Sequence, residues 1–144
     1  MMKFSINIKP KGKGRPRFAR RGKYVSTYTP KATVDYEETI KNAFLEQCEG
    51  QYDKEYTGPI KVSIWAFFEP PKSYSKKKRL ELIETPHLKT PDADNVAKSI
   101  LDALNGIAWK DDSQISDIDV HKYYDEEDKL IVKIKYEEDE ILKQ

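Results

Sequence analysis

The run Pro59-Ile-Lys-Val-Ser-Ile-Trp-Ala-Phe-Phe68 has an apolar side chain at every second position. From Ile60 onward this apolar series alternates with a second series made of Lys61, Ser63, Trp65 and Phe67. A period of two in β-branched and aromatic residues predicts a β-strand, here over residues 60–69. Pro70-Pro71 ends the strand, because proline has no N–H to donate to a neighbouring strand.

Strands are also expected on both sides of this run. Phe4, Ile6 and Ile8 alternate with polar residues, which predicts a strand over residues 2–9. Two further strand-like runs, 114–124 and 129–137, flank four consecutive acids that suit a hairpin turn.

Three segments have helical spacing. The segment 30–48 follows Thr29, a capping residue, and has Pro30 at its first helical position. A short basic helix is predicted over 75–84, beginning at a serine cap and stopping before Pro86. The segment 93–105 is the clearest helix, because its apolar residues form one face and Asn105-Gly106 supplies the stop.

These elements predict one α+β domain covering residues 1–144. The chain of 144 residues is too short for two independent cores. We expect a mixed β-sheet, formed by the four predicted strands, to pack against the helices at 30–48 and 93–105. The order of the strands does not follow from the sequence.

Charge is distributed unevenly along the chain. Residues 1–34 contain ten Lys or Arg and no acid, whereas the remaining 110 residues hold 16 basic and 25 acidic side chains. The segment 11–29 carries three glycines and one proline and is predicted to be an exposed basic loop. We interpret it as a phosphate-binding arm, although a solvated loop remains the alternative; its candidate DNA-binding residues are Arg15, Arg17, Arg20, Arg21 and Lys23. Lys76 and Lys77 offer a second phosphate contact, or simply the wet face of the short basic helix.

Several classes of protein are excluded. No stretch is apolar enough to span a membrane or to act as a signal peptide, so we expect no membrane partner and a cytoplasmic location. A single cysteine, Cys48, leaves no disulfide and no thiolate cluster for zinc. The phosphate-binding loop of nucleotide hydrolases is absent as well, which argues against a nucleotide cofactor.

Acidic residues gather around the helix at 93–105. Asp92 and Asp94 flank its start, and Lys98 lies one turn after Asp94 on the same face. If the strand that follows Asp111 and Asp112 lies beside the start of this helix, three or four carboxylates converge. Such a cluster of oxygen ligands without His or Cys favours Mg²⁺, with Mn²⁺ as a substitute, and so suits phosphodiester hydrolysis. The alternative is that these residues only cap a helix and occupy a solvated turn.

The pattern D-x-D-N-x-x-K, then D-A-L-x-G, then D-D-x-Q-I resembles the RusA family of Holliday-junction resolvases. In this chain it runs through the segment 90–115, with a looser likeness in the basic G-R-P-R-F and Y-T-P-K region. The resemblance implies metal-binding catalytic carboxylates at Asp92, Asp94 and Asp112, with Asp111 as a neighbouring ligand. It also implies a base or charge stabiliser at Lys98. Asn95 and Asp102 match the pattern too, and we interpret both as structural.

The resemblance implies a magnesium-dependent endodeoxyribonuclease that cuts four-way DNA junctions by paired nicks in recombination and repair. A four-way junction has approximate two-fold symmetry, so two equivalent cuts are most simply made by a homodimer. Two alternatives stay open. One is a basic DNA-binding module without catalysis, and the other is a nuclease for different branched DNA such as flaps and forks.

Overall fold

The structure of the chain is a computed structural model that describes residues 1–14 and 17–137. Its elements follow one another as β1 (Met2–Ile6), β2 (Arg17–Arg21), β3 (Tyr24–Tyr28), α1 (Lys31–Gln47), β4 (Ile60–Phe68), α2 (Lys76–Leu82), α3 (Ala93–Leu104), the single 3-10 turn η1 (Asp112–Gln114), β5 (Ile115–Tyr124) and β6 (Lys129–Tyr136). Among the described residues, no helix is both long enough and apolar enough to cross a membrane.

The main sheet has four strands in the order β1-β6-β4-β5. β6 pairs antiparallel with both β1 and β4, whereas β4 and β5 are parallel. The α+β class and the mixed sheet predicted from the sequence are thereby confirmed. Parallel neighbours need a long crossover, and here residues 69–114 supply it, carrying α2 and α3.

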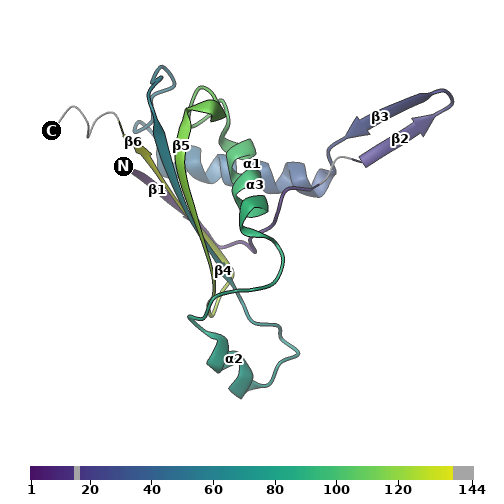
Figure 1. The fold of residues 1–144 in the computed structure, drawn as a ribbon, viewed down its shortest axis with the longest axis vertical. Helices are drawn as coiled ribbons and strands as arrows, with labels where there is room; N and C mark the ends of the chain where they lie inside the picture. Colours follow the sequence, from purple (N-terminus) through teal and green to yellow (C-terminus); the bar gives the residue numbers. More distant parts are fainter. Residues whose placement is uncertain (15–16, 138–144) are drawn as a thin grey trace.

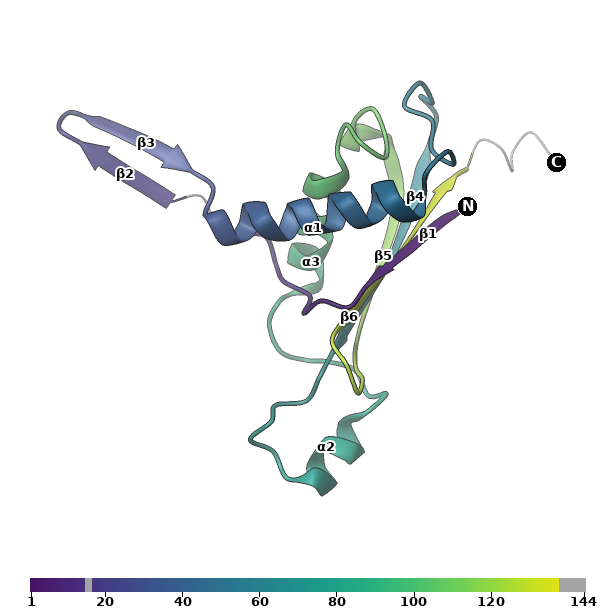
Figure 2. The same ribbon diagram turned by 180° about the vertical axis from the view of Figure 1, so that it is seen from behind.

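One face of the sheet carries the core. Alternate residues of β4 from Ile60 to Phe68 are buried, as the period of two predicts. Helices α1 and α3 both lie on this face (Figures 1 and 2). They bury Tyr36, Ile40 and Phe44 from α1 and Val96, Ile100 and Leu104 from α3. On the opposite face the side chains are half-buried, and there Trp65 stacks on His121 with ring centroids 5.2 Å apart.

The prediction of a loop over residues 11–29 is wrong for its second half. Residues 17–28 form an antiparallel hairpin of β2 and β3, in which Arg17 pairs with Tyr28 and Arg21 with Tyr24. Gly22 provides the turn with a φ of 60°, a conformation that glycine adopts without strain. The hairpin projects from the body of the molecule beyond the start of α1 (Figure 2).

The other boundaries differ from the predicted ones by few residues. β1 ends at Ile6 instead of residue 9, and α1 is preceded by Pro30 as its N-cap instead of Thr29. α2 begins after Ser75, whose hydroxyl oxygen accepts a hydrogen bond from the Lys78 N–H at 3.2 Å. The last residues of helices fray and change partners easily, which explains shifts of this size.

His87 is a buried titratable side chain at the edge of the core. Its ring stacks on Phe68 with centroids 3.8 Å apart and meets the edge of Tyr124 at 4.9 Å. Burial, and then the positive charges of Lys122, Lys89 and Lys9, lower the pKa of His87 from 6.5 to about 4. The imidazole is therefore neutral at physiological pH.

Candidate functional site

The exposed face of α3 carries charged residues one turn apart. Asp94, Lys98 and Asp102 follow one another at intervals of four, opposite the buried face of the helix. Asp92 is the N-cap residue, with its side chain exposed and not bonded to the first turn. Neither Asp92 nor Asp94 has a side-chain hydrogen bond or ion pair with a described residue. Both carboxylates are therefore available at the positive end of the helix dipole.

Asp111 and Asp112 lie at the other end of α3. The Asp112 N–H donates to Asn105 Oδ1 at 3.2 Å, and Trp109 Nε1 donates to Asp112 Oδ1 at 2.7 Å. Asp111 accepts from the Ser113 hydroxyl at 2.7 Å. Asn105 follows Asp94 by eleven positions, which corresponds to roughly 16 Å along the helix axis.

The convergence of three or four carboxylates expected from the sequence is therefore not found within one chain. It depended on a strand beginning beside the start of α3, whereas β5 begins beside the end of this helix. Across residues 1–14 and 17–137, no three His, Cys, Asp or Glu side chains are grouped so that they could hold a metal ion. The structure instead presents two acidic pairs at opposite ends of α3, Asp92 with Asp94 and Asp111 with Asp112.

Electrostatics connect Asp112 to the middle of the α3 face. Burial raises the pKa of Asp112, while the hydrogen bond from Trp109 lowers it. The charges of Asp102 and Asp111 raise it further and that of Lys98 lowers it, so that the net shift is upward. Lys98 thus lies along α3 between the two acidic pairs.

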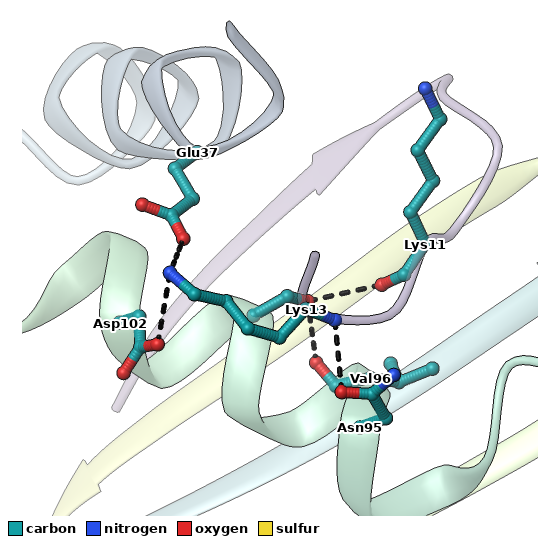
Figure 3. Close-up of polar contacts among 7 residues, drawn as sticks. Lys11, Lys13, Glu37, Asn95, Val96 and Asp102 are labelled. Carbon is teal, nitrogen blue, oxygen red and sulfur yellow. Dashed lines mark hydrogen bonds and ion pairs between the residues drawn. The ribbon is translucent and has the colours of Figure 1, made fainter. Parts of the chain in front are cut away.

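The segment 11–13 crosses α3 and binds it tightly (Figure 3). The Lys13 N–H donates to the Asn95 backbone oxygen at 3.2 Å and to Asn95 Oδ1 at 3.0 Å. The Ser99 hydroxyl donates to the Lys11 carbonyl at 3.1 Å. Asn95 therefore holds the segment that leads to the hairpin, which is the structural kind of role expected of it.

The side chain of Lys13 joins α1 to α3 (Figure 3). Its ammonium donates a short hydrogen bond to Glu37 and lies 3.1 Å from Asp102 Oδ2. Although burial lowers the pKa of Lys13, the hydrogen bonds and charges of Glu37 and Asp102 raise it above its ordinary value. No pattern in the sequence marks Lys13, because its partners Glu37 and Asp102 lie far away along the chain. Asp102 pairs with Lys13 of a neighbouring segment, which is consistent with the structural role expected of it.

Replacing Gly12 by alanine is expected to destabilise the protein by about 1–3 kcal/mol. A Cβ at this position would lie 2.2 Å from Asn95 Nδ2, so the Asn95 amide would have to move and lose the Lys13 N–H. Urea unfolding of Gly12→Ala measures the change. Asn95→Ala is the matched background, because without that amide the same substitution at Gly12 should cost much less. Equal costs in both backgrounds would contradict the steric cause.

The predicted DNA-binding residues fall into two separate groups. Arg20 and Lys23 are exposed on the hairpin, which also carries the exposed Tyr24 and Tyr28. Arg17 and Arg21 belong to β2. Arg15 lies outside the described residues. Lys76 and Lys77 are exposed on α2. The body of the molecule, including α3, separates α2 from the hairpin in both views (Figures 1 and 2).

The donor chemistry of the α3 face fits a hard divalent cation in one respect. Magnesium in proteins is often bound by one or two carboxylates together with water and substrate phosphate oxygens. The carboxylates of Asp92 and Asp94, which have no side-chain partner among the described residues, match that kind of site. A closed site made from protein ligands alone does not match, because Asp112 lies too far from this pair.

Comparison with known proteins adds independent information. The family model described as endodeoxyribonuclease RusA matches residues 7–135. The chain is also 33% identical over 138 residues to the uncharacterized protein YqaN of Bacillus subtilis (strain 168), a match that covers 93% of this chain and 95% of the relative. The matched region contains both acidic pairs, Lys98, the hairpin, β4, β5 and all of β6 except its last residue, whereas β1 lies before it. The chain therefore belongs to the RusA family of endodeoxyribonucleases.

Proposed function

We propose that the protein is a magnesium-dependent endonuclease that cuts four-way DNA junctions by paired nicks. The observation that supports this most strongly is the family match over residues 7–135, because it contains every acidic residue of the α3 motif together with Lys98. The exposed carboxylates at the start of α3, which no other described side chain pairs with, give the proposal a physical basis.

Each residue has a distinct part in the proposed reaction. Asp92 and Asp94 would hold the cation, which when bound polarises the scissile phosphodiester and lowers the pKa of water. Lys98, one turn further along the same face, would place its ammonium beside the phosphoryl oxygens and stabilise the negative charge that develops there. No step of this proposal requires a nucleotide.

Asp112 is included as a catalytic residue and metal ligand, with Asp111 as a neighbouring ligand, on the basis of the family resemblance alone. Trp109 occupies Asp112 Oδ1, which leaves Oδ2 as the oxygen open to solvent or substrate. Asp112→Asn retains the acceptor for Trp109 and removes only the charge. It therefore tests the chemical role of Asp112 without altering the fold around it.

Two protomers related by a two-fold axis would act on one junction. The two strands to be cut are related by the approximate symmetry of the junction, and one acidic site in each protomer would nick one of them. The basic hairpin and α2 would bind the phosphates of the arms.

The test is cleavage of a labelled four-way junction beside linear duplex, flap and fork DNA of matched sequence. We expect symmetric nicks in the junction with Mg²⁺, and no nicks with EDTA or with Asp92→Asn. Preferential cutting of flaps or forks would support the nuclease activity but show that four-way junctions are not the preferred substrate. Tight binding to the junction without any cut, in Mg²⁺ or Mn²⁺, would contradict the proposal and favour a binding module.

A further inference from the structure

Tyr74 lies between two lysines in the crossover that precedes α3. Lys89 Nζ donates a hydrogen bond to the Tyr74 hydroxyl oxygen at 2.8 Å. From the other side, the Lys78 ammonium lies 3.8 Å from the centre of the Tyr74 ring, which is a close cation–π contact. The phenol ring therefore holds two ammonium groups on one small area of surface.

A third lysine is fixed beside them. Lys122 Nζ donates a hydrogen bond to the Lys89 carbonyl oxygen at 2.7 Å. The backbone N–H of His87 donates to the Lys122 carbonyl oxygen at 3.0 Å. These bonds attach the segment 87–89 to β5. The low pKa of His87, to which the charges of Lys122 and Lys89 contribute, agrees with a locally positive field.

No carboxylate in the described part of the chain compensates this charge. The salt bridges formed there involve Lys13, Lys41, Lys61, Arg79 and His121, and none involves Lys78, Lys89 or Lys122. The ammonium groups of Lys78 and Lys89 meet at one phenol ring, and that of Lys122 contacts the backbone of Lys89; such positive charges repel one another unless an anion neutralises them. The arrangement is therefore suited to an anionic ligand.

The cluster adjoins the acidic pair at the start of α3. Lys89 precedes Asp92 by three residues, so at most about 10 Å of chain separates them. A DNA strand whose scissile phosphate lies at Asp92 and Asp94 would pass a neighbouring phosphate across this cluster.

We propose that Tyr74, Lys78, Lys89 and Lys122 form a binding site for the sugar-phosphate backbone of a DNA arm, next to the phosphate that is cut. This proposal rests on the proposed function, whose acidic site fixes the path of the strand. The Tyr74 hydroxyl accepts from Lys89, so its own proton remains free for a phosphate oxygen. Lys89 retains two further N–H donors, and its contact with Tyr74 limits how much side-chain entropy binding would cost.

The test is fluorescence anisotropy of a labelled four-way junction in EDTA, where no metal-dependent cutting occurs. We expect Lys89→Ala to weaken binding 3- to 10-fold, roughly what one lost charge-assisted contact costs. The slope of log K against log salt should also fall by about 0.9, the value for one phosphate contact. Tyr74→Phe retains the ring beneath Lys78 and should weaken binding about 2- to 5-fold, because it lacks only the hydroxyl.

Lys54→Ala is the matched control, because Lys54 is exposed in the turn before β4 and loses the same charge. It should leave affinity and salt slope unchanged. Affinity and slope equal to the wild type in Lys89→Ala would overturn the proposal, even if the protein cuts junctions. The proposal would also be overturned if Lys89→Ala lost binding to a different polyanion, polyglutamate, but kept its affinity for DNA. If instead no DNA is cut under any condition but Lys89→Ala still weakens binding, the binding site stands and the proposed catalysis fails.

Discussion

Asp94→Asn is expected to slow magnesium-dependent cutting of a four-way junction at least about 100-fold while leaving junction binding unchanged or tighter. The amide has the shape of the carboxylate but lacks the charge that attracts a divalent cation. Asp94 is exposed and has no described side-chain partner, so the substitution leaves the packing of α3 intact. Removing a negative charge beside DNA also reduces repulsion. Single-turnover cleavage with Mg²⁺, and anisotropy in EDTA, measure the two effects separately.

Asp117→Asn is the matched control for this experiment. Asp117 is an exposed aspartate of β5 whose carboxylate lies 3.6 Å from Lys61 on the sheet face away from α3. It should cut at the wild-type rate, because a surface ion pair contributes little to stability. A normal cleavage rate in Asp94→Asn would refute the assignment of the metal to the start of α3, and a full loss in Asp112→Asn alone would move the site to the other end of the helix.

The stability of the protein is expected to fall by up to about 3 kcal/mol through His87 alone as the pH decreases from about 6.5 to about 4. The pKa of His87 is about 4 in the folded state and 6.5 as its ordinary value, so the unfolded chain binds more protons between these limits. The contribution is complete above about pH 6.5 and is lost as the pH falls toward the folded-state pKa. Urea unfolding at a series of pH values measures how the free energy of unfolding changes with pH.

His87→Phe isolates this contribution, because phenylalanine keeps a ring between Phe68 and Tyr124 and cannot be protonated. The stability of this variant should depend less steeply on pH between 4 and 6.5 than that of the wild type. Equal slopes in the wild type and His87→Phe would show that His87 does not cause the acid sensitivity.

Elements that face the core were predictable from the sequence. β4 and α3 carry their apolar residues at periods fixed by burial, and the predicted ranges 60–69 and 93–105 differ by one residue from the observed ends. The hairpin of β2 and β3 shows no such pattern, because the side chains of β3 all face solvent; Tyr24, for example, is 81% exposed. A two-stranded ribbon exposed to solvent has no buried face, so its sequence need not alternate apolar and polar residues.

For the candidate site, the helical placement of Asp94 and Lys98 was predictable, but the arrangement of the acidic residues was not. The spacing of Asp94 and Lys98 fixes them on one face of a helix, and the structure places them there. The position of Asp112 depends on which end of α3 the next strand passes, and that choice is made by the packing of β5 against β4. Lys13 and Tyr74 take their partners from other elements, so a pattern along one sequence cannot reveal them.

The central place of β6 in the sheet links folding to synthesis of the chain. Of the four strands β6 is made last, yet it supplies the hydrogen bonds of β1 on one side and of β4 on the other. Until residues 129–136 leave the ribosome, β1 has no neighbour in the sheet and β4 keeps an open edge. A nascent chain or a fragment ending before Lys129 therefore exposes strands that invite aggregation. Such a fragment keeps only the β4–β5 pair of the sheet against which α3 and its acidic residues are positioned.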